Sequence, residues 1–143
     1  MVTFAPIQES HIADVIALWL GAHLAHPWND SERDIRLALA HPTNLVLGAR
    51  DEDGILVGTI MAGFDGHRGW IYSLAVADSQ RGKGTGRQLV QQAETWLAGQ
   101  GAPVVRLLVQ TSNAKVAGFY EACGYQRGDF IAFGKNLAET AGD

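Results

Sequence analysis

Cysteine is nearly absent from this chain, and long apolar runs are absent as well. Cys123 is the single cysteine, so no disulfide can form within the chain, and we expect a reducing, cytoplasmic location. No segment is apolar for long enough to cross a bilayer. Because Gln8, Glu9 and His11 interrupt the first apolar run, the start does not resemble a signal peptide. The sequence therefore predicts no membrane partner.

Positive charge is also scarce. The chain has 11 Lys and Arg against 15 Asp and Glu, which gives a formal net charge of −4. A protein that binds nucleic acid needs a broad basic face, so we expect no nucleic-acid partner. A length of 143 residues, with 47% apolar and 18% charged residues, is ordinary for a globular protein. We therefore expect one domain over residues 1–143.

Against this acidic background, one short segment concentrates glycines and cations. Residues 80–87 read QRGKGTGR, follow the strand-like run WIYSLAVA at 70–77, and lead into a helical pattern that begins at Gln88. The first amides of a helix have no partner inside the helix, and the helix dipole makes that end attractive to anions. Glycines leave these amides uncovered, so the segment predicts a site for a phosphate-bearing ligand.

Three glycine-rich patterns compete for this loop. The P-loop needs Ser or Thr after its Gly-Lys pair, but Gly84 stands there. The dinucleotide fingerprint G-x-G-x-x-G fails at its last position, which Arg87 occupies. The pattern R-x-x-G-x-G is satisfied by Arg81, Gly84 and Gly86. Taken alone, the loop also fits a flexible surface turn before a helix.

Hydrophobic periodicity predicts an α/β fold, an α+β arrangement with a mixed sheet in the order β-α-α-β-β-β-α-β-α-β-β. After its helical crossover, the fifth strand should lie parallel to the fourth. Expected strands cover Thr3 to Ile7, Asn44 to Ala49, Ile55 to Phe64, Gly69 to Ala77 and 104–109, with a closing hairpin at about 125–129 and 130–136. Expected helices run from a Ser10 cap to about His23, from a Ser31 cap with Asp34 to His41-Pro42, over 88–98 with a stop at Gly99 or Gly101, and over 114–122.

This order of elements, with R-x-x-G-x-G between the fourth strand and the third helix, resembles the GNAT N-acetyltransferase superfamily along the whole chain. A second signature lies downstream and resembles the family's last helix: Asn113, Ala117, Phe119-Tyr120-Glu121 and Gly124-Tyr125. Residues 28–30 and 63–69 further resemble the small bacterial YpeA-type branch. The resemblance implies acetyl-CoA as cosubstrate and an acyltransferase fold with splayed fourth and fifth strands.

The resemblance also implies where the coenzyme is held. The pyrophosphate would lie on the backbone amides of 82–87, and the pantetheine arm would pair with the open edge of strand 69–77. A backbone N–H at Leu74 or Ala75 would face the thioester oxygen. The expected coenzyme-binding residues are Leu74, Ala75, Val76, Arg81, Gly82, Lys83, Gly84, Thr85, Gly86, Arg87, Asn113, Phe119 and Tyr120.

For catalysis, the resemblance assigns Tyr120 as the general acid that protonates the leaving thiolate, although an aromatic packed on the apolar face of a short helix is the alternative. Asn113 fits a helix cap equally well, and Glu121 fits an exposed charge. Strand 70–77 holds no acid or histidine, so the proton of the amine must leave through water or a loop residue. The loop candidates are His26, Asp30, Asp65 and His67.

The acceptor is expected to be an amine on a small molecule or a protein, and many members of the family form homodimers. Residues expected on the acceptor side are Trp28, Asp30, Asp65, His67 and Tyr72, and Trp28 equally fits a staple for the second helix. His11, His23 and His26 lack a supporting carboxylate pattern, so no metal site is expected. Because no strand-borne base is present, a non-catalytic acyl-CoA sensor on the same fold is the alternative function.

Overall fold

The computed structural model describes residues 1–25 and 30–137. The expected positions His26 and Trp28 lie outside the described residues. The chain forms two compact units, Met1–Leu107 and Leu108–Asp143, which are taken in turn below.

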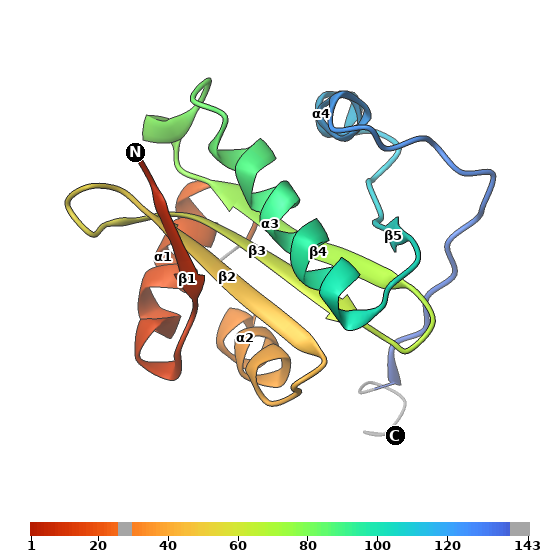
Figure 1. The fold of residues 1–143 in the computed structure, drawn as a ribbon, viewed down its shortest axis with the longest axis horizontal. Coiled ribbons are helices and arrows are strands. Elements are labelled where there is room, and N and C mark those ends of the chain that lie inside the picture. The colour runs from red at the N-terminus through yellow and green to blue at the C-terminus, as the bar shows by residue number, and fades with distance from the viewer. Residues whose placement is uncertain (26–29, 138–143) are drawn as a thin grey trace. The chain divides into compact units, whose positions relative to one another are not determined.

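The first unit is built on a five-stranded sheet with the order β1-β2-β3-β4-β5 (Figure 1). Strands β1 to β4 are antiparallel neighbours, and β5 lies parallel to β4, which confirms the predicted mixed sheet and its crossover. The strands are β1 Thr3–Pro6, β2 Asn44–Arg50, β3 Leu56–Phe64, β4 Gly69–Val76 and β5 Val105–Arg106. The helices are α1 Ile12–Gly21, α2 Ser31–Leu39 and α3 Thr85–Gln100, with short 3-10 turns η1 Glu9–His11 and η2 Asp78–Gln80.

Helices cover the sheet on both faces. On one face, Val15 of α1 and Ile35 of α2 pack with the cross-strand pair Val46 and Met61 in one buried cluster. On the other face, α3 approaches so closely that a Cβ on Gly58 would lie 2.8 Å from Leu89 Cδ1. Alternate residues of β3 therefore serve two different helix layers, as the side-chain period of a strand requires.

A buried hydrogen bond ties α1 to the sheet. Trp19 Nε1 donates to Thr59 Oγ1 at 2.9 Å, and both side chains are almost completely buried. In the interior, a polar group that loses its partner costs more than the hydrogen bond itself is worth.

We expect Trp19→Phe to lower the free energy of unfolding by roughly 1–3 kcal/mol beyond its packing loss, because the Thr59 hydroxyl would be left without a partner. Thr59→Val should have a similar cost, and the double variant should be less destabilised than the sum of the two single variants. Urea denaturation of all four proteins measures this coupling. Strict additivity would mean that the bond contributes nothing.

The helix starts differ from the predicted caps. Before α1, Gln8 and His11 form a reciprocal capping box around η1, so Ser10 is not the cap. At α2, the carboxylate of Asp30 accepts from the Arg33 amide at 3.1 Å, while Ser31 is the first helical residue and is buried. In both cases a residue one or two positions before the predicted cap has a side chain that accepts from an amide of the first helical turn.

Helix α3 begins at Thr85, three residues before the predicted start at 88. Gly84 takes a left-handed φ of 81° at its N-cap, so the glycine loop itself feeds directly into the first helical turn. The helix ends where Gly101 adopts a φ of 96°, which confirms that residue as the stop, and Gly99 lies inside the helix.

The second unit contains α4, Ala114–Ala122, with the bounds that the sequence predicts. The strand expected at 104–109 is reduced to Val105–Arg106 in the first unit, and the strands expected at 125–129 and 130–136 are not formed. A strand needs a neighbouring ladder, and the apolar pattern of this segment does not supply one. Instead the chain bends so that the Phe130 ring lies against Gly128, and Phe130, Ile131 and Phe133 remain exposed.

Candidate active site

The edge of β4 is open over most of its length. Strand β5 pairs with β4 only at Gly69↔Val105 and Trp70↔Arg106. In the described part of the chain, residues 71–76 of β4 have no strand partner on that side. The predicted splayed pair of strands is therefore present, and the stretch 74–76 expected to bind pantetheine lies on the open edge.

A β-bulge distorts β4 at the same place. The register pairs Met61 with Tyr72 and Thr59 with Ala75, so one residue of β3 stands opposite two residues of β4. The first of these two, Ser73, has a left-handed φ of 53°. Bulges reorient backbone groups and often occur beside active sites. This one also places Tyr72 and Ala75 on the same face of the sheet.

The glycine loop presents a bare helix end. Gly82 and Gly84 have left-handed φ values of 75° and 81°, and a Cβ on either would meet nothing within 4 Å. Since Gly84 is the N-cap, no side chain caps the first-turn amides of α3. Lys83 and Arg87 have exposed side chains nearby in sequence. These open amides and cations fit a pyrophosphate, which binds to such helix ends through the same groups.

Two hydrogen bonds brace the loop. Arg81 Nε donates to Asp78 Oδ1 at 2.7 Å, and this bond lowers the pKa of the Asp78 carboxyl. The buried Thr85 hydroxyl donates to Gln80 Oε1 at 3.1 Å. Both contacts connect η2 to the loop or to the start of α3. The Thr85 side chain therefore supports the loop from inside, and only its backbone amide is left to face a ligand.

In the second unit, Tyr120 is held in an aromatic cluster. Its ring makes edge-to-face contacts with Phe119 at 5.1 Å and Tyr125 at 5.7 Å between centroids. Burial, with a smaller contribution from Cys123, raises the pKa of Tyr120 to about 12. Its phenol therefore stays protonated at neutral pH, as a proton donor requires. Asn113 caps α4 by accepting from the Val116 amide at 3.2 Å.

A cavity of about 340 Å³ lies between the end of α2 and the central strands. Of the expected acceptor-side residues that the structure describes, Tyr72 alone lines it, and the exposed fraction of Tyr72 is 50%. The sequence interpretation missed its other members, because they come together only through the register of β2, β3 and β4. The lining residues are Leu37, Ala38, His41, Asn44, Met61, Ala62 and Tyr72.

The family follows from comparison with known sequences. The acetyltransferase (GNAT) family model matches residues 12–125 of this chain. The chain belongs to the GNAT acetyltransferase family. It is accordingly an acetyltransferase, and the resemblance based on the glycine loop and the Asn113–Tyr125 signature is confirmed at the level of the family.

Solved structures share the fold of this GNAT acetyltransferase. The aminoglycoside 6'-N-acetyltransferase AAC(6')-Ih from Acinetobacter baumannii has a TM-score of 0.80 at 19% identity, over 95% of this chain and 98% of that one. AAC(6')-Iy, in complex with the bisubstrate analogue CoA-S-monomethyl-acetylneamine, gives 0.80 at 16% identity over 95% and 98%. Glucosamine-6-phosphate N-acetyltransferase from Arabidopsis thaliana gives 0.72 at 18% identity over 96% and 99%.

The hairpin residues of this acetyltransferase are engaged in the turn between β3 and β4. Asp65 Oδ1 accepts the amides of Arg68 at 2.7 Å and His67 at 2.8 Å, and Oδ2 accepts Trp70 Nε1 at 3.2 Å. The backbone hydrogen bonds are the main cause of a lowered pKa for Asp65. His67 Nδ1 lies 2.7 Å from a guanidinium nitrogen of Arg68. A carboxylate bonded in this way is a weak base.

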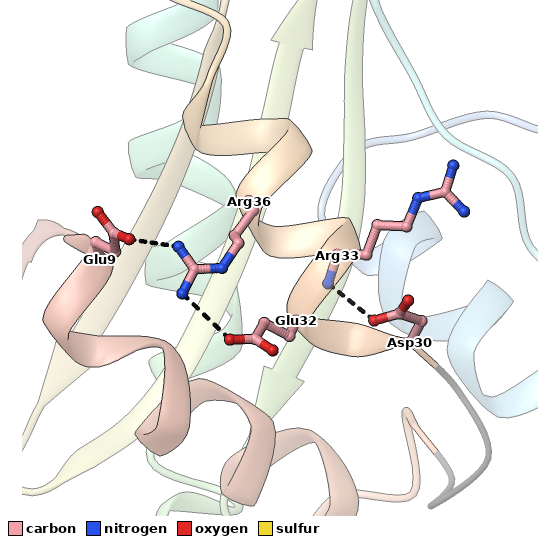
Figure 2. Close-up of polar contacts among 5 residues, drawn as sticks. All are labelled: Glu9, Asp30, Glu32, Arg33 and Arg36. Atoms are coloured by element: carbon pink, nitrogen blue, oxygen red, sulfur yellow. Dashed lines mark hydrogen bonds and ion pairs between the residues drawn. The ribbon is translucent and has the colours of Figure 1, made fainter.

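Surface ion pairs fix α2, which forms one wall of the cavity. Figure 2 shows the guanidinium of Arg36 between Glu9 of η1 and Glu32 of α2, with the Glu32 contact at 3.2 Å. The hydrogen bond to Glu9 is the main cause of a raised pKa for Arg36, and the hydrogen bond to Glu32 adds to it. In the same view Asp30 bonds the Arg33 amide, so the expected acceptor residue Asp30 acts here as a helix cap. Exposed pairs contribute little energy, but they hold the helix to η1 in one arrangement.

No group of three or more His, Cys, Asp or Glu side chains among residues 1–25 and 30–137 is arranged to hold a metal ion. Over the same described residues, no helix is long and apolar enough to span a membrane.

Proposed function

We propose that this enzyme transfers the acetyl group of acetyl-CoA to a primary amine by direct attack within a ternary complex. One observation carries the proposal: the open, bulged edge of β4 leads through η2 into an uncapped helix end lined by glycines and cations. A strand edge can pair with the amides of pantetheine, and the helix end can bind the pyrophosphate. Together these features match the two halves of coenzyme A.

In this proposal the backbone and cations of the loop hold the coenzyme. The amides of 82–87 contact the pyrophosphate, with charge from Arg81, Lys83 and Arg87, while Leu74, Ala75 and Val76 pair with the pantetheine arm. The assignment of Asn113, at the N-cap of α4, and of Phe119 and Tyr120, within α4, as coenzyme-binding residues belongs to the same proposal.

The chemical step exchanges a C–S bond for a C–N bond. The amine nitrogen attacks the thioester carbon, and a backbone N–H at Leu74 or Ala75 stabilises the oxyanion that forms. Collapse of the intermediate breaks the C–S bond, and Tyr120 donates its proton to the thiolate. A lysine-like ammonium group of pKa ~10.4 must first lose one proton so that its nitrogen can attack, which costs roughly 4 kcal/mol at pH 7.4. The nitrogen loses a second proton as the amide forms, and this proton restores, through solvent, the one that Tyr120 gives to sulfur. The ammonium group and acetyl-CoA thus yield the amide, the free thiol and one proton.

We propose that a water chain accepts the proton that the ammonium group loses before the attack. The only polar side chains on 70–77 besides the indole of Trp70 are those of Tyr72 and Ser73. Burial and the nearby charge of Asp65 raise the pKa of Tyr72, while hydrogen bonds lower that of Asp65, so neither group is suited to act as a base at neutral pH.

The same proposal includes four further properties of the protein. These are membership of the YpeA-type branch, one functional domain over 1–143, a cytoplasmic location and a homodimer. The acceptor is a small amine, a peptide N-terminus or a protein lysine. The lack of a strand-borne base favours a second candidate function, a non-catalytic acyl-CoA sensor on the same fold.

An acceptor screen that detects the free thiol of coenzyme A tests the proposal. We expect amine-dependent thiol release, and we expect acetyl-CoA and CoA, but neither ATP nor NAD, to raise the melting temperature. Strong stabilisation by acetyl-CoA with no amine acetylated would favour the sensor. Equal stabilisation by all four ligands would contradict the coenzyme site itself.

A further inference from the structure

We propose that the cavity at the end of α2 binds the acceptor, and that this acceptor is a compact primary amine with an uncharged, mainly apolar body and a hydrogen-bonding group at its far end. This inference rests on the proposed acetyl transfer and specifies its substrate class. It is carried by the position, charge and lining of the cavity.

One end of the cavity lies at β4, the strand expected to face the thioester of acetyl-CoA. Tyr72 lines the cavity and stands just before the bulge of β4. It is two residues from Leu74, a distance of roughly 7 Å along a strand. Because the bulge leaves Tyr72 and Ala75 on one face, a molecule in the cavity approaches the expected thioester position from the α2 side.

The charges favour a single ammonium group at that end. Burial, together with the carboxylate of Asp65, raises the pKa of the Tyr72 hydroxyl, so a negative charge acts on this end of the cavity. None of the seven described lining residues is acidic. A polycationic acceptor would therefore find no partner for its remaining ammonium groups, which would have to lose water without compensation.

The middle and the far end of the cavity differ in polarity. Leu37, Ala38 and Met61 form apolar walls, while His41 and Asn44 lie on the β2 side. Strands β2 and β4 are two interstrand spacings apart, about 10 Å, which sets the length of the acceptor.

His41 is the group available at the far end. The Asn44 amide already donates to the Ala38 carbonyl at 3.4 Å, and its Oδ1 would lie 2.7 Å from a Cβ on Gly63. Within the described chain, the structure shows no hydrogen bond for the imidazole of His41. An imidazole can donate or accept, so a hydroxyl or amide at the far end of the acceptor would find a partner.

The first test compares four amines at equal concentrations with the full chain and acetyl-CoA. Tyramine and phenethylamine have an apolar body, and spermidine and neamine are polycations. We expect kcat/KM for tyramine to exceed that for either polycation at least about 10-fold, and to exceed that for phenethylamine by roughly 5-fold. Equal or better use of a polycation would overturn the substrate class while leaving acetyl transfer intact.

The second test uses matched variants. Leu37→Glu puts a charge on the cavity wall and should raise KM for phenethylamine roughly 10-fold, whereas Leu20→Glu, at an exposed leucine on α1 outside the cavity, should not change it. His41→Ala should remove the advantage of tyramine over phenethylamine. If turnover of both amines is unchanged in Leu37→Glu and His41→Ala, the acceptor binds elsewhere.

Binding without turnover separates the two proposals. If no amine is acetylated, the proposed function fails, and the cavity is judged by the melting temperature. A rise caused by tyramine in the wild type but not in Leu37→Glu would support the cavity as an amine site, and no rise in either would overturn it.

Discussion

Replacing Tyr120 by phenylalanine should lower kcat by roughly 10²–10⁴-fold and leave KM for acetyl-CoA nearly unchanged, because in the proposed mechanism the lost hydroxyl protonates the leaving thiolate and does not bind the coenzyme. The phenol is suited to this task, since burial raises the pKa of Tyr120 to about 12 and keeps the proton in place. The phenyl ring preserves the edge-to-face contacts with Phe119 and Tyr125. Steady-state kinetics with saturating acetyl-CoA measure the effect.

The pH profile and a neighbouring tyrosine provide the controls. The acid form of Tyr120 is the active one, and a raised pKa moves its loss to higher pH, so kcat should not fall from this group below about pH 11. Tyr125→Phe removes a hydroxyl from the same aromatic cluster and should change kcat much less than Tyr120→Phe. Equal kcat values for wild type and Tyr120→Phe would remove the residue from the mechanism.

The parts of the site that the sequence predicted are those that depend on local chain chemistry. Arg81, Gly84 and Gly86 lie within six residues, and glycine in a left-handed conformation before a helix is a local requirement. The same holds for α4, whose predicted bounds are confirmed, and for the stop at Gly101. Local patterns therefore predicted the glycine turn before α3, the end of α3 and the bounds of α4 before any tertiary contact was known.

The cavity proposed for the acceptor depends on strand register, which local patterns do not contain. Asn44, Met61 and Tyr72 come from three strands and meet only because of how those strands pair. Asp30 and Asp65 were expected to face the acceptor because they are acids in connecting segments. The structure shows their oxygens bonded to backbone amides, the usual role of such residues at helix starts and turns.

The bulge in β4 and the absence of the two predicted final strands both show that a strand-like sequence pattern does not determine how strands pair. A strand of alternating residues predicts regular pairing, yet Ser73 takes a left-handed φ because β3 offers one residue where β4 has two. Residues 125–136 carry enough apolar side chains to predict two strands, but pairing needs a partner edge. An apolar pattern alone therefore does not produce a strand when no neighbouring strand is present to pair with it.

Replacing Gly84 by aspartate should weaken acetyl-CoA binding roughly 100-fold, because it adds a negative charge where the pyrophosphate is expected. Two unit charges about 6 Å apart repel by about 3 kcal/mol at an effective dielectric constant of 20. Folding should survive, since Asp and Asn tolerate a left-handed φ better than other side chains and a Cβ at Gly84 meets nothing within 4 Å. Isothermal titration with acetyl-CoA gives Kd directly.

Gly84→Asn separates charge from shape, because asparagine has the size of aspartate and the same tolerance for the left-handed region. We expect Gly84→Asn to weaken binding less than about 10-fold, and the difference between the Asn and Asp variants to shrink as salt screens the exposed loop. If both variants bind acetyl-CoA as the wild type does, the anion lies away from the start of α3. If both lose binding equally at every salt concentration, the glycine is required for close backbone approach, and repulsion is not the cause.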